Sequence, residues 1–157
     1  MCGICGIVDY KENRVVNEDI LHRMCAEMKH RGPDDEGTYI YNNRMSVGLG
    51  HRRLSIIDLS SLGHQPMSNE DGAIWIVFNG EIYNYKELKE ELRSSYQFRS
   101  DSDTEVILAA YERYGERCVD HLNGIFAFAI WDRKKSRLFL ARDRIGVNPL
   151  YYFWDKQ

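Results

Sequence analysis

The sequence lacks the features that would place the protein in a membrane or on nucleic acid. No apolar run approaches the ~20 residues that a transmembrane helix needs. Lysine and arginine number 21 against 24 acidic residues, and the net charge of −3 favours neither nucleic acid nor an anionic membrane as a partner. The first residues also lack the basic and apolar regions of a secretory signal. We therefore expect a cytoplasmic protein.

Cysteine is scarce, and its spacing argues against a metal centre. The four cysteines are Cys2, Cys5, Cys25 and Cys118. No second Cys or His pair at zinc-binding spacing accompanies Cys2 and Cys5, so we expect no metal site. A redox C-x-x-C normally opens a helix, whereas this one leads into a strand pattern, where a separation of three puts the two thiols on opposite faces. A paired redox or zinc role is the less favoured alternative. Cys25 and Cys118 are expected to be small core residues.

The chain is long enough for one domain, residues 1–157, with a sizeable core. Apolar patterns predict strands, and capping signals predict helices. Predicted strands cover 4–10, 38–41, 45–51, 73–78, 126–131 and 138–141, with another beginning at 151; predicted helices cover 17–29, a stretch after Asn84, and 102–115. Buried strands alternating with helices favour sheets layered with helices.

Asn79 and Gly80 directly follow the most apolar strand pattern. Asn-Gly is the strongest two-residue hairpin signal, and the local sequence alone favours that interpretation. A helix start at Asn84 so soon afterwards argues against a simple hairpin. An amide side chain beside a glycine N–H also offers two donors that can hold the oxyanion of an acyl-transfer intermediate.

If Met1 is removed, Cys2 becomes the first residue and carries a free α-amine as well as its thiol. The residue then has both a thiol, with an ordinary pKa of about 8.5, and an α-amine, with an ordinary pKa of about 7.7–8.0. The chain terminus can thus supply the base for its own nucleophile. His51 could instead act as the base in a Cys–His pair. We favour the amine because it is tethered to the nucleophile.

Eight short motifs occur in one order along essentially the whole chain. They are M-C-G (1–3), R-G-P-D (31–34), H-R-R-L-S-I-I-D (51–58), G-H-Q-P-M (63–67), N-G-E-I-Y-N (79–84), S-D-T-E (102–105), F-A-F-A (126–129) and R-D-R-I-G-V-N-P-L-Y-Y (142–152). Together they resemble the glutaminase domain of asparagine synthetases, a class II glutamine amidotransferase of the N-terminal-nucleophile hydrolase type. The resemblance implies an α+β fold with four αββα layers, in which two antiparallel sheets pack together between helices.

The resemblance also implies hydrolysis of the side-chain amide of glutamine to glutamate and ammonia. By position, the implied catalytic residues are Cys2, Asn79 and Gly80, and the implied glutamine-binding residues are Arg53, Ile57, Asn79, Gly80, Glu81 and Asp103. The planar fork of Arg53 matches the α-carboxylate of glutamine, and Asp103 offers a negative charge to its α-ammonium. Without the resemblance, Arg53 could be a solvated charge, and Asp103 an acid favoured by the helix dipole.

The sequence also departs from the family. It contains no S-G-G-x-D-S loop and no G-x-x-x-x-G-K-[ST]. We expect no cofactor for the glutaminase step, and ATP and magnesium only in a missing synthetase domain. The expected partner is an ammonia-accepting synthetase domain or subunit, with a homodimer left open. We also expect a fragment whose sheet edge is left unpaired near 151–157. Asn148 stands where relatives usually have lysine.

Two alternatives to this function stay open. The same half-reaction could feed ammonia to a different acceptor, such as a sugar or a peptide. The fold could also serve as a regulatory module without turnover. The joint presence of Cys2, Arg53, Asn79, Gly80 and Asp103 favours the enzyme, because a scaffold needs none of them.

Overall fold

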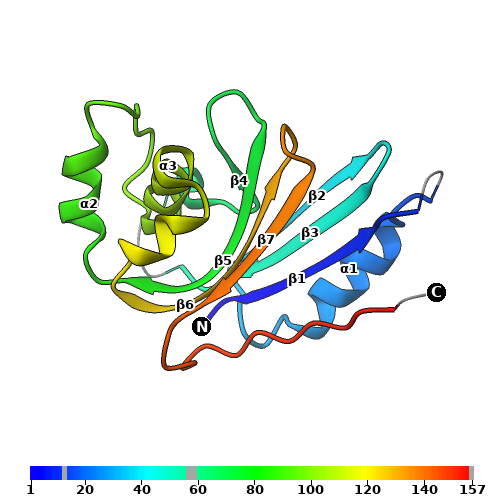
Figure 1. Cartoon of the computed structure of the whole chain (residues 1–157). Coiled ribbons are helices and arrows are strands. Elements are labelled where there is room, and N and C mark those ends of the chain that lie inside the picture. The colour runs from blue at the N-terminus through cyan, green and yellow to red at the C-terminus, as the bar shows by residue number, and fades with distance from the viewer. Residues whose placement is uncertain (12–13, 56–59, 156–157) are drawn as a thin grey trace.

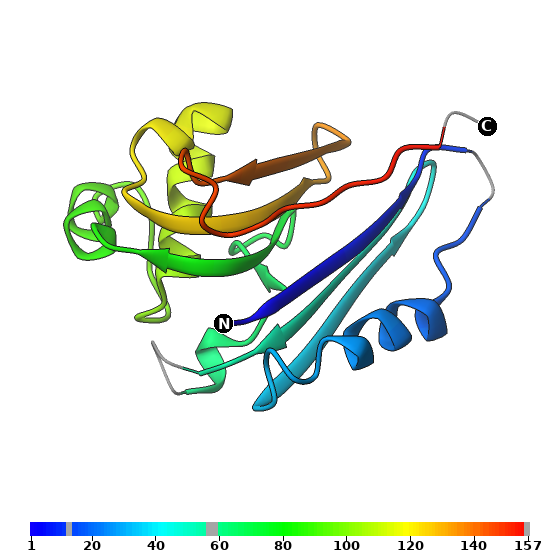
Figure 2. The same cartoon turned by 90° about the horizontal axis from the view of Figure 1, so that it is seen from below.

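The computed structural model describes residues 1–11, 14–55 and 60–155, which form four layers (Figures 1 and 2). One sheet has the strand order β1-β3-β2 and the other β4-β5-β6-β7, and all pairings are antiparallel. Helix α1 covers the outer face of the first sheet, α3 covers the outer face of the second, and α2 packs against α3. This arrangement confirms the predicted α+β sandwich.

The elements follow one another along the chain in a simple order. They are β1 (Gly3–Asp9), α1 (Glu18–Glu27), β2 (Asp35–Asn42), β3 (Ser46–Arg53), a short 3₁₀ turn (Ser61–Gly63), β4 (Met67–Ser68), β5 (Ile74–Ile82), α2 (Tyr85–Leu92), α3 (Asp103–Tyr114), a second 3₁₀ turn (Gly115–Asp120), β6 (Gly124–Asp132) and β7 (Arg137–Arg142). Most predicted elements therefore exist, with bounds shifted by a few residues.

Strand β3 lies in the middle of the first sheet and is buried along its whole length. Val47 and Leu49 belong to the core between the two sheets. Gly48 and Gly50 alternate with them and face α1. A Cβ at Gly50 would lie 2.6 Å from Cys25 Sγ and 2.7 Å from Cys5 Sγ. Large and small residues thus alternate along β3. The face with the large residues packs on the second sheet, and the face with the glycines leaves room for α1.

Strand β5 is covered on both faces, as its apolar sequence predicts. Ile76 and Phe78 pack into the core under α2 and α3, and Val77 packs into the core between the sheets. Asn79 follows Val77 by two residues, so its side chain also points toward the first sheet. The pleat of β5 therefore brings a polar residue to the end of the inter-sheet layer.

Several local predictions are wrong. Asn79 and Gly80 lie inside β5, opposite Ala127 and Phe126, so the hairpin interpretation fails. Asn84 precedes α2, but its side chain bonds His121 O and Asn123 N instead of capping the helix. In both cases a long-range partner replaces the local hydrogen bond that the sequence suggests.

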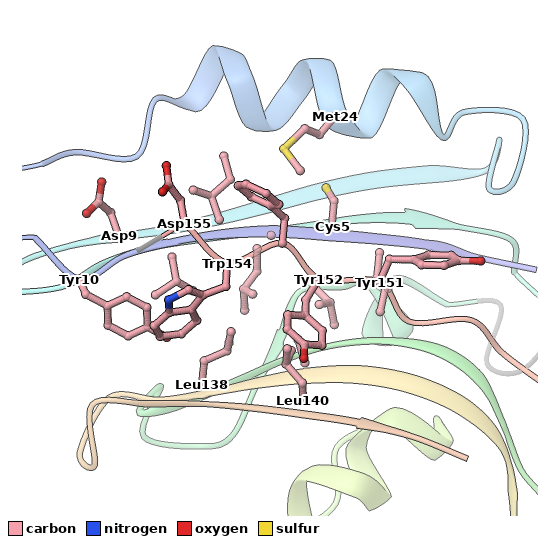
Figure 3. A pocket seen from close by; sticks show the side chains of 18 of the residues that line it. Cys5, Asp9, Tyr10, Met24, Leu138, Leu140, Tyr151, Tyr152, Trp154 and Asp155 are labelled. Carbon is pink, nitrogen blue, oxygen red and sulfur yellow. The ribbon is translucent and has the colours of Figure 1, made fainter. Parts of the chain in front are cut away.

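The strand expected from Tyr151 onward is also not found, since residues 151–155 form no regular structure. This segment crosses a groove between the open edges of β1 and β7, which we call the edge groove (Figure 3). The edge groove has a volume of about 1450 Å³, and its lining is mostly apolar. Tyr151 and Tyr152 are 91% and 80% exposed, so the segment crosses the groove without filling it.

Candidate active site

A cavity of about 130 Å³ gathers the predicted site residues at one end of the inter-sheet layer. We call it the Cys2 cavity. Its lining includes all six of the predicted residues that the structure describes: Cys2, Arg53, Asn79, Gly80, Glu81 and Asp103. These residues come from the position before β1, the end of β3, the second half of β5 and the first turn of α3. Ile57, the seventh, lies outside the described residues.

Cys2 directly precedes β1 and is held by its neighbours. The backbone N–H of Leu54 donates to Cys2 Sγ at 3.3 Å, and Leu54 O lies 3.7 Å from the same sulfur. Arg31 Nε donates to Cys2 O at 3.0 Å, which fixes the backbone of Cys2. Met1 lines the same cavity and is 56% exposed. The chain terminus therefore lies at the same cavity as the predicted site residues.

Gly80 presents an N–H that the sheet does not use. Its partner in β6 is Phe126, whose N–H and C=O both bond Asp143 on the opposite side. Gly80 and Phe126 are therefore a non-hydrogen-bonded pair, and the N–H of Gly80 points away from β6. A Cβ on Gly80 would lie 2.2 Å from Ile125 O. Glycine is therefore needed here to keep the strands in register while this donor faces outward.

Asn79 places its side-chain amide in the cavity wall beside Gly80. The residue is 5% exposed, and its Nδ2 donates to Asn148 Oδ1 at 3.4 Å. Asn79 Oδ1 is buried and has no hydrogen-bond partner among the residues that the structure describes. Asn79 and Gly80, two adjacent residues with N–H donors, thus line the same small cavity as Cys2, and such a pair of donors can form an oxyanion site.

Arg53 and Asp103 bring opposite charges to the cavity. Arg53 is 7% exposed, and its Nη1 donates to Ser60 O at 3.1 Å. Asp103 is 4% exposed, and its Oδ2 accepts the N–H of Ile82 at 3.1 Å. A guanidinium and a carboxylate that share one cavity can bind the two charged groups of an amino acid.

The carboxyl group of Asp103 is poorly compensated in this structure. Burial raises its pKa to about 6, and the negative charge of Glu81 acts in the same direction. The backbone N–H groups of Ile82 and Thr104 oppose these effects without cancelling them. A cation brought by a ligand would lower this pKa again and stabilise the carboxylate. The electrostatics of this end of the cavity therefore suit an ammonium group.

The alternative base, His51, is poorly suited to act on Cys2. It is 1% exposed, and its Nε2 lies 3.1 Å from Phe78 O, so this nitrogen carries the proton and donates it. Burial lowers its pKa to about 4, which keeps the ring neutral near pH 7. His51 is also not among the residues that line the Cys2 cavity in the described part of the chain.

Cys5 lies apart from Cys2, as the strand geometry predicts. Its sulfur is 3.7 Å from Cys25 Sγ, between β1 and α1, and all four cysteines are free thiols. The hydrogen bond with Cys25 and burial both raise the pKa of Cys5. Cys25 and Cys118 are buried in the core, as expected. The two thiols of the C-x-x-C thus face different surroundings.

Sequence reasoning assigned no role to three polar residues that shape the site. Arg31 bonds the backbone of Cys2, Asn148 bonds Asn79, and Gln65 accepts the N–H of Phe78 at 2.7 Å and donates to Thr104 at 3.1 Å. All three lie in motifs that carry the resemblance. In the sequence, each of these residues is visible only as a polar residue inside a motif. The fold is needed to show which atoms their side chains contact.

No group of three or more His, Cys, Asp or Glu side chains is placed to hold a metal ion in the ranges 1–11, 14–55 and 60–155. Among the same residues, no helix has the length and apolarity to cross a bilayer.

Comparisons with known proteins agree with this geometry. The chain is 49% identical to a putative glutamine-hydrolysing asparagine synthetase of Methanocaldococcus jannaschii over 99% of this chain and 32% of that protein. It is 46% identical to asparagine synthetase 3 of Bacillus subtilis over 97% of this chain and 25% of that protein. The chain therefore spans about a third or less of these relatives.

A solved structure shares the fold at much lower sequence identity. It is described as the allosteric regulatory enzyme of purine biosynthesis, and it matches 92% of this chain and 38% of its own with a TM-score of 0.72 and 18% identity. The model of the glutamine amidotransferase domain family matches residues 1–157. The chain therefore belongs to the glutamine amidotransferase domain family.

Proposed function

We propose that this chain hydrolyses the side-chain amide of glutamine to glutamate and ammonia. The observation that carries the proposal is the Cys2 cavity, where a thiol, two oxyanion donors, a guanidinium and a carboxylate from distant parts of the chain line one small space. Glutamine needs this set, because it is a zwitterion at one end and a neutral amide at the other. Family membership supports the same reaction.

In the proposed mechanism, Cys2 is the nucleophile once Met1 has been removed. The free α-amine takes the thiol proton, and the sulfur attacks the amide carbon. The N–H of Gly80 and the amide of Asn79 stabilise the oxyanion of the tetrahedral intermediate. The α-ammonium then returns the proton to the leaving nitrogen, ammonia departs, and water hydrolyses the thioester to glutamate.

Substrate binding uses the charged residues at the cavity wall. Arg53 binds the α-carboxylate of glutamine, while Asp103 and Glu81 bind its α-ammonium. Ile57 lies outside the described residues, and its part in glutamine binding stays a prediction. No cofactor takes part in this half-reaction, and the protein acts in the cytoplasm.

We further propose that the ammonia serves asparagine synthesis. The relatives described above are named asparagine synthetases, and this chain covers only a part of each. The acceptor step, with its ATP and magnesium, would then belong to a synthetase domain or subunit. The chain alone should release glutamate from glutamine but form no asparagine from aspartate, ATP and magnesium.

The test is a fusion with a leader peptide that a protease removes to leave Cys2 as the first residue. Uncleaved protein should release no glutamate above background, and cleaved protein should turn over glutamine. Intact mass confirms the terminus in each sample. The matched control is the same cleaved fusion with Cys2→Ala. Equal turnover before and after cleavage would overturn the role of the α-amine, and turnover by Cys2→Ala would overturn the role of the thiol.

A further inference from the structure

Asn148 is fully buried beside the residue that supplies one oxyanion donor. It follows β7 in a segment that Asp143 organises. The carboxylate of Asp143 accepts the N–H groups of Gly146, Val147 and Asn148 at 2.6, 2.9 and 3.0 Å, and that of Phe126 at 3.2 Å. Burial alone would raise the pKa of Asp143, but these donors lower it to about 2. The carboxylate of Asp143 therefore holds the backbone of Asn148 in place beside the cavity.

The side chain of Asn148 bonds Asn79 twice. Its Oδ1 accepts from Asn79 Nδ2 at 3.4 Å, and its Nδ2 donates to the backbone oxygen of Asn79 at 3.4 Å. Asn79 Oδ1, at the other end of the same amide, has no partner in the described part of the chain. Among the described residues, Asn148 is thus the side chain that fixes the orientation of the Asn79 amide.

This orientation matters because the two ends of an amide act oppositely on an oxyanion. The NH₂ end donates and stabilises the negative oxygen, while the carbonyl end repels it. The nitrogen Nδ2 carries two hydrogens, of which the contact with Asn148 uses one. The second remains for the oxyanion. If the amide turned by half a rotation, Oδ1 would take its place and the donor would be lost.

We propose that Asn148 is a positioning residue for glutamine hydrolysis, which orients the Asn79 amide so that an N–H faces the oxyanion. The glutamine hydrolysis in this inference rests on the proposed function, whereas the contact between Asn148 and Asn79 rests on the structure. Asn148, at which the sequence departs from the family pattern, lies in the wall of the Cys2 cavity.

The experiment compares Asn148→Leu, which keeps much of the volume but removes the polar atoms, with the unchanged protein. We expect kcat for glutamine to fall about 10- to 100-fold and KM to change less than about threefold, because the lost interaction acts on the transition state. In an Asn79→Ala background the same substitution should lower kcat no further. An additive loss in that background, or a loss in KM alone, would overturn the proposal.

Asn69→Leu is the matched control, because Asn69 is a buried amide outside the Cys2 cavity that bonds the backbone of Ala73 and Ile74. It should lower the melting temperature without changing kcat. Asn148→Ser replaces Asn148→Leu if the leucine variant does not fold.

A second readout does not depend on turnover. The side-chain ¹⁵N–¹H signals of Asn79, identified by their loss in Asn79→Ala, should shift and exchange faster with water in Asn148→Leu. If the unchanged protein released no glutamate, the proposed function would fail while this measurement still tested the contact. Unaltered Asn79 signals would overturn the positioning role by themselves.

Discussion

The edge groove and the Cys2 cavity both lie beside strand β1, and they differ in size and in lining. The edge groove has a volume of about 1450 Å³, with leucines and the aromatic segment 151–154 along its walls (Figure 3). The Cys2 cavity measures about 130 Å³ and gathers a thiol, a guanidinium, a carboxylate and buried amides. Reaction chemistry needs oriented polar groups with little water between them. The proposed reaction is therefore assigned to the smaller cavity, although the edge groove has the larger volume.

The strongest test of this comparison removes each thiol of the C-x-x-C in turn. Cys2 lines the Cys2 cavity, whereas Cys5 lines the edge groove. Cys2→Ala should lower glutamine hydrolysis by at least about 10³-fold, because no second nucleophile replaces the thiol. Cys5→Ala should retain most of the activity. Glutamate release measures both variants, and similar losses would favour a paired C-x-x-C chemistry instead.

The same two thiols illustrate what the sequence could and could not predict. The period-2 geometry of a strand correctly separates Cys2 from Cys5, and the alternation of Val47 and Leu49 with Gly48 and Gly50 is a local pattern that the fold follows. The gathering of the site residues was predicted through the motif resemblance, because periodicity carries no information on which distant segments meet.

Asn79 and Gly80 show why the sequence could not predict the rest of the site. Their local signal is that of a hairpin, but pairing with β6 keeps them inside β5 and turns the N–H of Gly80 outward. The contact between Asn79 and Asn148 joins residues 69 positions apart, and it depends on how Asp143 organises the segment after β7. Such long-range pairings override local preferences and leave no trace in a single sequence.

Asp103→Asn should give the next largest effect. The substitution removes the negative charge for the α-ammonium but keeps an oxygen that can accept the N–H of Ile82. A charge-assisted bond contributes about 1.5–3 kcal/mol, so KM for glutamine should rise about 10- to 100-fold with a smaller change in kcat. Steady-state kinetics of glutamate release test this. An unchanged KM would remove Asp103 from the substrate site.

The same variant should unfold at a higher temperature in the absence of glutamine. An acid whose native pKa of about 6 lies above its ordinary value near 3.9 loses stability as pH rises between these values. At pH 7.5 the loss is complete, and it amounts to about 1–3 kcal/mol. Removing the charge should restore this stability, so activity and stability move in opposite directions. A lower melting temperature would show that the carboxylate supports the fold.

The pH dependence of substrate binding should follow the same group. Protonated Asp103 cannot bind an ammonium, so KM for glutamine should rise as pH falls below about 6, by up to tenfold per pH unit. The α-amine of Cys2 also gains a proton on acidification, but this acts on the chemical step. Asp103→Asn is the control and should show a flat KM over the same range. A sloping KM in this variant would assign the titration to another group.

The smallest effects should come from substitutions in the edge groove. Its exposed tyrosines test whether a loss of apolar surface there affects glutamine hydrolysis. Tyr151 and Tyr152 are 91% and 80% exposed, so Tyr151→Ser and Tyr152→Ser should change the free energy of unfolding by less than about 0.5 kcal/mol. Glutamine hydrolysis should stay within about twofold, because neither residue lines the Cys2 cavity in the described part of the chain. Binding of an apolar fluorescent dye should fall, since these rings contribute to the lining of the groove. A loss of hydrolysis that matched the loss of dye binding would show that the two hollows act together, and the division between them would then have to be abandoned.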